Sequence, residues 1–416
     1  MSKKLSRSNA FNSLKVNFNN KLRRIPRTGL IAVILLAIIA ILVLSYFLYQ
    51  RFSQVNTLQT QGIDLQIELD QVKEKLGQTE TEYQDLKNQD QKVRNDELEE
   101  NLNNLKITYK QAVTQYERIL DLRDDSADVS DQEELLATVL TLLSKDLYQE
   151  ATEKMEELQK SIATLQAELT AKAQLNIPKA PTSNDAPASG YSRQSVSTDI
   201  GSYTISLVAG DLSSTRVIVD TASGSDCGND CPVLPLSDYI SRNGAYAGIN
   251  GSYFCPASYP SCAGKTNTFD LLVMNKDKKY FNSDNNVYSN NPAVIFFDGS
   301  IRFVGAASGW GRDTSPTGVL SNYPLLLSGS EIRFAGDGDP RKGSKGNRSF
   351  VANKGNIVYI GVVHGATVAE AAVALKGLGM ENAMNLDSGG STALWSGGYK
   401  VGPGRNIPNA ILFVRK

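Results

Sequence analysis

One short stretch, NLDSGGSTALW at residues 385–395, places a carboxylate directly before paired glycines and two hydroxyls. An ordinary turn needs only one glycine with an Asn or Asp, whereas paired glycines also let the backbone approach a ligand closely. Asp387 supplies the carboxylate, and the amides and hydroxyls after it suit an anion-binding nest. The nest candidates are Gly389, Gly390, Ser391 and Thr392. The stretch predicts a catalytic, phosphate-holding loop; the alternative is that Asp387 only caps its own turn.

Four residues elsewhere could complete chemistry at an acetal carbon beside a phosphate. Such hydrolysis needs a carboxylate that attacks or activates water, and donors that hold the phosphate. Arg348 and Arg405 are candidates for phosphate oxygens, and Asn250 for orienting sugar or water. His364, the only histidine, is the only candidate for imidazole chemistry. The alternative for each arginine is a structural salt bridge, and for His364 a buried structural role.

Other chemistries lack the residues that they require. The chain contains no G-x-S-x-G motif, which a serine hydrolase elbow needs. Residues 336–346 hold Asp337 and Asp339 but lack the spacing of an EF-hand. A metal-dependent phosphodiesterase would need a ligand cluster that one histidine does not supply. We therefore expect no metal and no cofactor, and the net charge of −1 indicates no nucleic-acid partner.

Five segments, taken in order, resemble the phosphodiester glycosidase family: AYAGINGSYFCP (245–256), GNRSF (346–350), the strand and helix of 356–379, NLDSGGSTALW and GPGRNIPNAILF (402–413). The resemblance covers residues 196–416. The family is usually described with a glycine after the aspartate, where this chain has Ser388. The resemblance implies cleavage of sugar-1-phosphodiesters at the glycosidic bond, with Asp387, Asn250 and His364 as catalytic candidates. The implied substrate- or phosphate-binding residues are Arg348, Gly389, Gly390, Ser391, Thr392, Arg405 and Asn409.

All four cysteines lie in one short window. They are Cys227, Cys231, Cys255 and Cys262. Outside the cytoplasm such a cluster indicates two disulfides, for which three pairings are open. Zinc is the rival, but the spacings C-x3-C and C-x6-C match no common finger, and His364 is remote in sequence. We expect disulfides that tie these two loops to the INGSYF strand end.

The N-terminus has the pattern of a membrane signal anchor. Residues 1–28 hold eight basic residues and no acidic one, and residues 30–49 carry no charge. Twenty helical residues span about 30 Å, the thickness of a bilayer core. A cleaved signal peptide is the alternative, with a shorter apolar core of about 7–15 residues. We predict a basic cytoplasmic tail at 1–28, a single-pass anchor at 29–50 in the cell membrane, and an extracytoplasmic C-terminal domain.

Residues 51–177 predict an α-helical coiled coil. They repeat apolar residues at alternating spacings of three and four, which is typical of heptads. The repeat is interrupted at residues 121–132, where Ser130 and Glu133 form a plausible capping box for a second helix. Two architectures fit: a folded-back helical hairpin, or a long stalk that forms a homo-oligomer through the coiled coil. The simplest role is a spacer between membrane and head.

A Pro/Ser/Ala-rich linker at 178–195 separates this coiled coil from a glycosidase-like domain at 196–416. Short β-rich runs follow, with a hairpin signal at Asp298-Gly299 and one clear helix at 367–379 opened by Thr367 and Glu370. The fold class is therefore α+β: a C-terminal head with a mixed β-sheet flanked by helices, preceded by a transmembrane helix and a coiled coil.

Two functions are compatible with these features. The first is a membrane-anchored extracytoplasmic hydrolase that cleaves glycosyl phosphodiesters in envelope or exopolysaccharide glycans. The alternative is a non-catalytic sugar-phosphate-binding head on a coiled-coil stalk, serving cell-envelope attachment. Product analysis separates the two functions.

Overall fold

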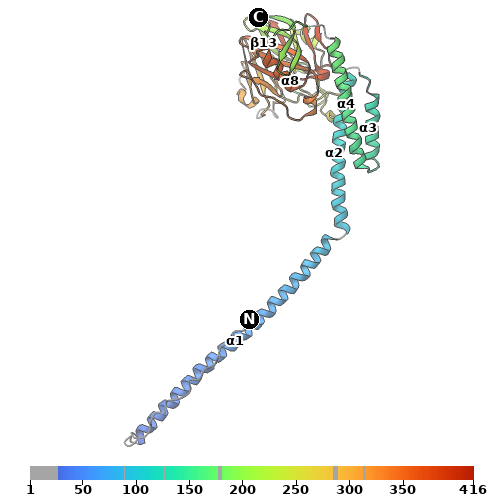
Figure 1. The fold of residues 1–416 in the computed structure, drawn as a ribbon. Coiled ribbons are helices and arrows are strands. Elements are labelled where there is room, and N and C mark those ends of the chain that lie inside the picture. Colours follow the sequence, from blue (N-terminus) through green and yellow to red (C-terminus); the bar gives the residue numbers. More distant parts are fainter. Residues whose placement is uncertain (1–26, 89, 125–126, 177–179, 284–288, 313–314) are drawn as a thin grey trace. The chain divides into compact units, whose positions relative to one another are not determined.

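The computed structural model describes residues 27–88, 90–124, 127–176, 180–283, 289–312 and 315–416. The chain divides into two compact units, Met1–Leu98 and Glu99–Lys416. Figure 1 shows the long helices of the N-terminal part in blue and the β-rich head in yellow to red. Because the two units are separate bodies, each is described by itself.

The first unit is dominated by one helix, α1 (Arg27–Lys87). Its segment Ile31–Lys87 is long and apolar enough to cross a membrane, by length and composition alone. The side chains of residues 31–88 are exposed, including the heptad positions Leu65, Leu69 and Val72. The predicted cytoplasmic tail lies almost entirely outside the described residues. This apolar helix, together with the disulfides of the head, indicates a secreted or membrane-anchored protein.

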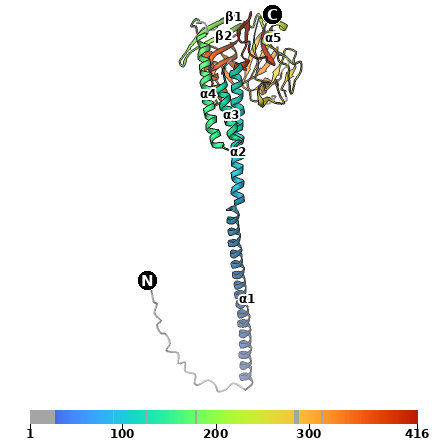
Figure 2. The same cartoon turned by 90° about the vertical axis from the view of Figure 1, so that its right-hand side faces the viewer.

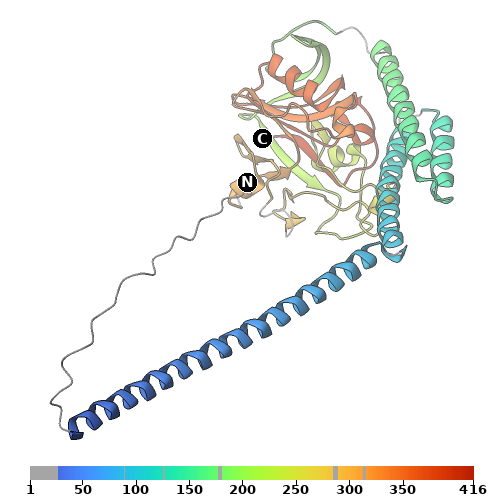
Figure 3. The same cartoon turned by 60° about the horizontal axis from the view of Figure 1, so that its bottom comes forward.

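The second unit begins within α2 (Asp90–Asp124), and its part of this helix folds with α3 (Ser130–Leu143) and α4 (Tyr148–Asn176). In Figures 2 and 3, α3 and α4 run beside the C-terminal part of α2. Their shared core is made of Ala112, Ile119, Leu122, Val129, Leu136, Val139, Leu143, Ala151, Met155, Leu158 and Ile162. The capping box expected at Ser130 does not form, because α3 has Val129 at its N-cap and Ser130 is already its first helical residue. The Glu133 amide donates to Val129 O at 3.0 Å, and the Ser130 hydroxyl donates to Asp128.

The largest sheet of the head has seven strands, and its pairs of named strands are antiparallel. In spatial order they are β1 (Gly190–Thr198), β2 (Gly201–Asp211), β13 (Ile357–Ala366), β12 (Gly346–Lys354), β14 (Asn382–Asn385), β10 (Leu325–Ser328) and β11 (Glu331–Ile332). Helix α8 (Val368–Gly377) packs on one face through Ala371 and Leu375. The expected capping box forms, with Thr367 accepting from the Glu370 amide and Glu370 from the Thr367 amide.

Two five-stranded sheets complete the head. One is ordered β16 (Tyr399–Val401), β15 (Leu394–Ser396), β4 (Ala247–Asn250), β17 (Asn409–Arg415) and β3 (Thr215–Thr221). The other is ordered β6 (Tyr280–Phe281), β5 (Val273–Met274), β9 (Gly318–Ser321), β7 (Ala293–Phe297) and β8 (Ser300–Val304). The predicted hairpin joins β7 to β8, with Phe297 opposite Ser300 and Gly299 at a φ of 108°. Shorter helices are α5 (Leu236–Asn243), α7 (Pro340–Gly343) and the 3₁₀ turns Pro260–Cys262, Ala307–Trp310 and Gly389–Ser391.

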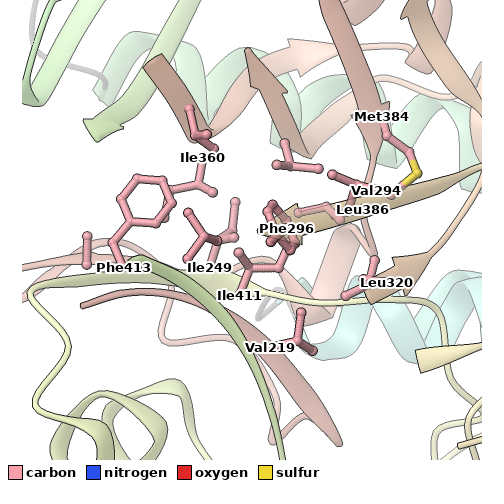
Figure 4. Close-up of a cluster of buried hydrophobic side chains, with 14 of the residues drawn as sticks. Val219, Ile249, Val294, Phe296, Leu320, Ile360, Met384, Leu386, Ile411 and Phe413 are labelled. Carbon is pink, nitrogen blue, oxygen red and sulfur yellow. The ribbon is translucent and has the colours of Figure 1, made fainter. Parts of the chain in front are cut away.

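The main core lies where the three sheets meet. Figure 4 shows side chains of all three converging, among them Ile360 from the seven-stranded sheet, Ile411 from the second and Phe296 from the third. Each is fully buried, which stabilises the fold by roughly 1.5–3 kcal/mol per side chain of this size. The α+β fold class predicted from the sequence is confirmed. This core holds the strand ends from which the candidate site is built.

Each disulfide closes its own short loop. Cys227 is bonded to Cys231 and Cys255 to Cys262, so no thiol is free. The sequence left three pairings open, and the observed pairing is the one between nearest neighbours. The expectation that a disulfide ties the first loop to the INGSYF strand end is therefore wrong, because Cys227 and Cys231 bond within that loop. The second loop starts five residues after Asn250 and is anchored to the strand end by chain continuity.

Candidate active site

A cavity of about 480 Å³ lies against the loop that follows β14. Its lining includes Asp387, Ser388 and Gly389 from that loop, and Tyr253 and Tyr259 from the segment after β4. Helices α2 and α4 also line it, through residues such as Arg118, Asp121 and Gln166. A volume of this kind suits a ligand of one or two sugar rings. The cavity therefore has one wall from the head and one from the helical segment.

Asp387 is positioned by its backbone as well as by its side chain. Its amide donates to Gly251 O at 3.0 Å, and its carbonyl accepts from Asn250 Nδ2 at 2.6 Å. Its carboxylate accepts from the Ser388 amide at 2.9 Å and from the Ser391 hydroxyl. These contacts tie the end of β14 to the end of β4, and they hold the carboxylate at the cavity in one orientation.

The environment of Asp387 raises the pKa of its carboxyl group towards neutral pH. Burial disfavours the charged form and raises the pKa of Asp387 to about 7, against the opposing effects of Ser391, Arg405 and the Ser388 amide. Asp121 of α2 adds to the rise, because it is a second negative charge nearby. A carboxyl group that titrates near neutral pH is suited to acid–base or nucleophilic work, since both its forms are populated.

The glycine turn is built for close approach, but its nearest neighbour is another part of the protein. A Cβ at Gly390 would lie 2.3 Å from Arg405 Nη2, so the missing side chain makes room for that guanidinium. Gly389 has a φ of 63°, in the left-handed region that favours glycine. The amides of Ser391 and Thr392 donate within the turn. Among the described residues, the amides of Gly389 and Gly390 have no hydrogen-bond acceptor, and Gly389 lines the cavity.

Two hydroxyls of this loop have structural surroundings. Ser388, at the position where the family usually has glycine, donates to Leu386 O and accepts from the Ser349 amide. Its hydroxyl thus ties the loop to β12. Thr392 is buried, and its hydroxyl has no partner among the described residues. Of the groups in the predicted nest, those without a hydrogen-bond partner among the described residues are therefore the amides of Gly389 and Gly390 and the hydroxyl of Thr392.

Asn250 and Asn409 support the site from behind. Asn250 is fully buried, and its Oδ1 accepts from Ser349 Oγ at 3.0 Å and from the Ala393 amide at 3.1 Å. Asn409 is also fully buried and accepts from the Ser252 amide at 3.0 Å. A Cβ at Gly251 would lie 1.7 Å from Asn409 Oδ1, which explains the glycine of the Asn-Gly pair. Within the described residues, neither asparagine lines the cavity.

His364 lines the cavity, but both of its ring nitrogens are engaged. Nδ1 lies 2.9 Å from Asn347 Oδ1, and Nε2 lies 2.9 Å from Ser206 Oγ. Since an amide oxygen only accepts, Nδ1 carries the proton and Ser206 donates to Nε2. Burial, with Arg193 nearby, lowers the pKa of His364 to about 4, so the ring is neutral at pH 7. The arrangement gives His364 a positioning role for Asn347, at the start of β12.

Arg348 lies under the cavity with its guanidinium largely committed to the backbone. Nε donates to Ala366 O at 2.9 Å, and Nη2 donates to Arg341 O at 3.0 Å and to Ser344 O. Only 8% of the residue is exposed. Burial lowers its pKa, but no carboxylate lies within ion-pair distance of it in the described part of the chain. Arg348 therefore brings an unneutralised charge to the site while it braces the loop at 341–346.

Arg405 lies at the centre of a charged group that the sequence does not reveal. Nη2 donates to Asp121 Oδ1 at 2.8 Å and to Asp124 Oδ2 at 3.1 Å, both from α2. Tyr259 OH donates to the same Asp121 carboxylate at 2.6 Å. Burial opposes the charge of Arg405, yet Asp121 and Tyr259 outweigh it and the net pKa is raised. Arg405 thus lies between two carboxylates, Asp387 on one side and Asp121 on the other.

Sequence reasoning missed the residues that helices and loops bring to the cavity. Tyr253 lines it beside Asp387, accepts from Asn385 Nδ2 at 2.7 Å, and has a pKa raised by burial and by Asp387, so its phenol stays protonated. It lies in the quoted INGSYF motif, which was a usable signal. Asp121 had none, because one residue of a helical repeat looks like another until its partner is known.

Comparisons with known proteins agree with the resemblance read from the motifs. The model of the phosphodiester glycosidase family matches residues 243–414, which confirms that the head contains a domain of this family. The match supports a glycosidase-type function. No curated protein sequence matches the chain significantly.

Solved structures with a related arrangement are remote in sequence. The zebrafish N-acetylglucosamine-1-phosphodiester alpha-N-acetylglucosaminidase catalytic domain, auto-inhibited by its pro-peptide, is 18% identical with a TM-score of 0.43; the match covers 57% of this chain and 87% of that one. A protein from Synechocystis described as hypothetical is 14% identical with a TM-score of 0.43. That match covers 54% of this chain and 62% of the Synechocystis chain.

Proposed function

We propose that this chain, whose residues 243–414 form a phosphodiester glycosidase domain, hydrolyses the glycosidic bond of sugar-1-phosphodiesters. The observation that carries the proposal is Asp387: a carboxyl group with a pKa of about 7, held against a cavity of about 480 Å³ beside cationic side chains. A carboxylate acts at the anomeric carbon, and cations bind the phosphodiester charge.

The reaction breaks the bond between the anomeric carbon and the phosphate oxygen. Ionised Asp387 either takes a proton from the water that attacks the anomeric carbon, or attacks that carbon itself to form a glycosyl ester that a water molecule then hydrolyses. In both routes the electron pair of the broken bond leaves with the phosphate. The products are a free sugar and a phosphomonoester. Because the second pKa of such a monoester is about 6, it leaves without a strong general acid. One carboxylate is therefore sufficient here, whereas glycosidases with alkoxide leaving groups also need a strong general acid.

The remaining site residues have distinct tasks in this reaction. Arg405 lowers the energy of ionised Asp387 and lies close enough to attract the departing phosphate. The amides of Gly389 and Gly390 supply further donors for an anion. Tyr253 keeps its phenol proton and can donate to a sugar oxygen beside Asp387. Asn250 and Asn409 act through the backbone, by fixing the loops that carry Asp387 and Tyr253.

The substrate and location follow from the rest of the chain. We propose that residues 29–50 anchor the protein in the cell membrane, with the basic tail inside and the head outside. The substrate would then be a glycan phosphodiester of the envelope or of an exopolysaccharide. Protease added to intact cells should trim the head; protection of the head until the membrane is permeabilised would reverse the orientation.

One assay tests the function directly. The full chain in detergent micelles is incubated with methyl esters of several sugar 1-phosphates, and the products are identified. A free reducing sugar plus methyl phosphate supports the glycosidase. Methanol plus a sugar 1-phosphate would place the cut at the P–O bond. Binding without turnover on every sugar would support the binding head instead. The Asp387→Asn chain serves as the blank.

A further inference from the structure

The cavity holds more basic residues than the catalytic carboxylate accounts for. They are Arg118, Arg341, Lys342, Lys345, Arg348 and Arg405. Four of the six have a carboxylate partner, in the pairs Arg341–Glu117, Lys342–Asp337, Lys345–Glu370 and Arg405–Asp121. Each pair offsets part of the positive charge that its cation offers a ligand. Among the described residues, Arg118 and Arg348 are the two lining cations without a carboxylate at ion-pair distance.

These two arginines differ in how many of their donors are used. Arg348 gives three hydrogen bonds to backbone carbonyls and is committed to the loop beneath the cavity. Arg118 donates one bond in the described structure, from Nη1 to Gln115 Oε1 at 3.0 Å. A guanidinium has five N–H donors, so most of those on Arg118 remain for a partner. Arg118 is half-buried and lines the same cavity as Asp387.

The electrostatic surroundings of Arg118 favour an anion. Burial and the neighbouring Arg341 both lower its pKa, and Asp121 offsets them only in part. Two guanidinium groups that face one cavity repel each other, and the repulsion is relieved when an anion lies between them. A phosphate is well suited, because its oxygens accept two parallel bonds from a guanidinium fork.

Helix α2 is fixed on both sides of Arg118. Glu117, the residue before it, accepts from the Ser261 amide at 3.2 Å and pairs with Arg341. Asp121, one helical turn later, pairs with Arg405 and Tyr259. The adjacent Ile119 is fully buried in the core of the three helices. Arg118 is therefore held on the cavity wall by contacts that do not involve its own side chain.

We propose that Arg118 binds the phosphate of the substrate, so that the helical segment supplies a substrate-binding residue to the glycosidase site. The inference rests on the proposed function, because the phosphate is that of the sugar-1-phosphodiester. It changes the role of the segment between membrane and head from a spacer to a wall of the active site. Arg118 lies outside residues 243–414, so the family domain alone lacks this contact.

The test compares Arg118→Gln, Arg118→Lys and Arg123→Gln in the full chain in detergent. Arg123 is the matched control: it is on the same helix, exposed, paired with Glu133 of α3, and absent from the described cavity lining. Inorganic phosphate is the probe, with its affinity measured by calorimetry. Arg118→Gln should weaken phosphate binding at least ~10-fold, the loss expected for a charge-assisted bidentate contact. Arg118→Lys should recover part of it, because charge returns without the fork.

The control and the kinetics separate this inference from the proposed function. Arg123→Gln should bind phosphate as the wild-type chain does. Turnover with an unchanged KM in Arg118→Gln would overturn the role of Arg118 and leave the glycosidase intact. If the wild-type chain cleaves no phosphodiester but binds phosphate, and Arg118→Gln does not bind it, the glycosidase function is overturned and the role of Arg118 is supported. Equal phosphate affinity in wild type and Arg118→Gln would overturn the role of Arg118. So would the absence of binding to the wild type at millimolar phosphate.

Discussion

Arg405 Nη2 lies 2.8 Å from Asp121 Oδ1, and these residues come from opposite walls of the cavity, 284 positions apart in the chain. The pair joins the helical segment to the glycine turn, since the same guanidinium occupies the space that Gly390 leaves free. It also joins the segment to Asp387, whose pKa is affected by both members. The helix α2 thereby influences the acidity of the catalytic candidate without touching it.

This relationship predicts the effect of Asp121→Asn. The charge of Asp121 raises the pKa of Asp387, whereas the charge of Arg405 lowers it. Asp121 also weakens the effect of Arg405, because the two side chains form an ion pair. Asp121→Asn removes a negative charge near Asp387 and leaves Arg405 without that partner. Both changes favour the ionised form of Asp387, so its pKa should fall. The acid limb of the rate profile, measured as kcat against pH, should move to lower pH by a fraction of a unit.

Asp124→Asn is the comparison for this experiment. Asp124 pairs with the same guanidinium but is 46% exposed at its side chain, so solvent screens it more. We expect a smaller shift of the acid limb. An acid limb that stays in place in Asp121→Asn, or moves to higher pH, would contradict the electrostatic link between α2 and Asp387.

Local sequence signals predicted much of the head because they depend on neighbours in the chain. Thr367 and Glu370 form their capping box within one helical turn, and Asp298-Gly299 turns its hairpin within two residues. Where long-range contacts decide, local composition is a poorer guide. The apolar run at 269–275 has the composition of a strand, yet only Val273–Met274 forms one. Phe269 is instead buried in a loop, bridged to Phe254.

The candidate site shows the same division. The position of Asp387 at a strand end follows from its flanking residues. The partners of Arg405 do not, because Asp121 and Asp124 belong to a helical repeat that carries no mark of the head. Ser130 illustrates the limit on a small scale: helix α3 has Val129 at its N-cap, so the Glu133 amide donates to Val129 O and not to the Ser130 hydroxyl. Spacing alone does not fix the residue at which a helix starts.

The second prediction concerns the carboxylate itself. Asp387→Asn keeps the size of the side chain and its acceptor for the Ser388 amide, but it removes the charge that acts at the anomeric carbon. Turnover should fall at least ~10²-fold with the fold intact, in line with the loss of a positioned acid–base or nucleophilic group. Circular dichroism checks the fold, and product analysis measures the rate. A folded variant that turns over at the wild-type rate would remove Asp387 from the mechanism.

The pH dependence of the wild-type rate gives a third prediction. Because ionised Asp387 is the active form, kcat should rise with pH until Asp387 is deprotonated and level off above about pH 7. His364, with a pKa near 4, is neutral throughout this range and should add no further limb. The measurement is kcat from pH 5 to pH 9 at saturating substrate. A rate that is flat between pH 5 and pH 8 would show that a different group carries the chemistry.

The fourth prediction concerns how stability changes with pH. Asp387 changes it in the opposite direction to a surface aspartate whose pKa is lowered on folding. The pKa of Asp387 is about 7 in the folded chain, against about 3.9 for an unfolded aspartate. Between these pH values the folded state binds more protons at Asp387 than the unfolded state does. The contribution of Asp387 to the free energy of unfolding therefore falls as the pH rises from about 4 to 7. Above pH 7 the buried charge is fully present. Asp387→Asn should raise the unfolding temperature at pH 8 and have little effect near pH 4.

Asp298→Asn is the control, because the pKa of Asp298 is lowered in the folded chain whereas that of Asp387 is raised. Contacts with Lys416 and Arg216 lower the pKa of Asp298, so its ionised form is stabilised in the folded chain. Its removal should leave the unfolding temperature at pH 8 unchanged or slightly lower. If Asp387→Asn also lowers the unfolding temperature at pH 8, then the ionised carboxylate contributes more through its hydrogen bonds to Ser388 and Ser391 than burial costs.

The last prediction uses the close approach of Arg405 to the glycine turn. In Gly390→Ala the new methyl would lie 2.3 Å from Arg405 Nη2, so the guanidinium must move away from Asp387 and from Asp121. We expect a higher KM and a lower kcat, by about 10-fold together, because the displaced charge serves both phosphate binding and the ionised carboxylate. The double variant Gly390→Ala with Arg405→Gln supplies the decisive comparison. Once the guanidinium is absent, the methyl has less to displace, and the two losses should not add. Additive losses would mean that Gly390 serves the ligand directly, through its own amide, and that its fit to Arg405 is incidental.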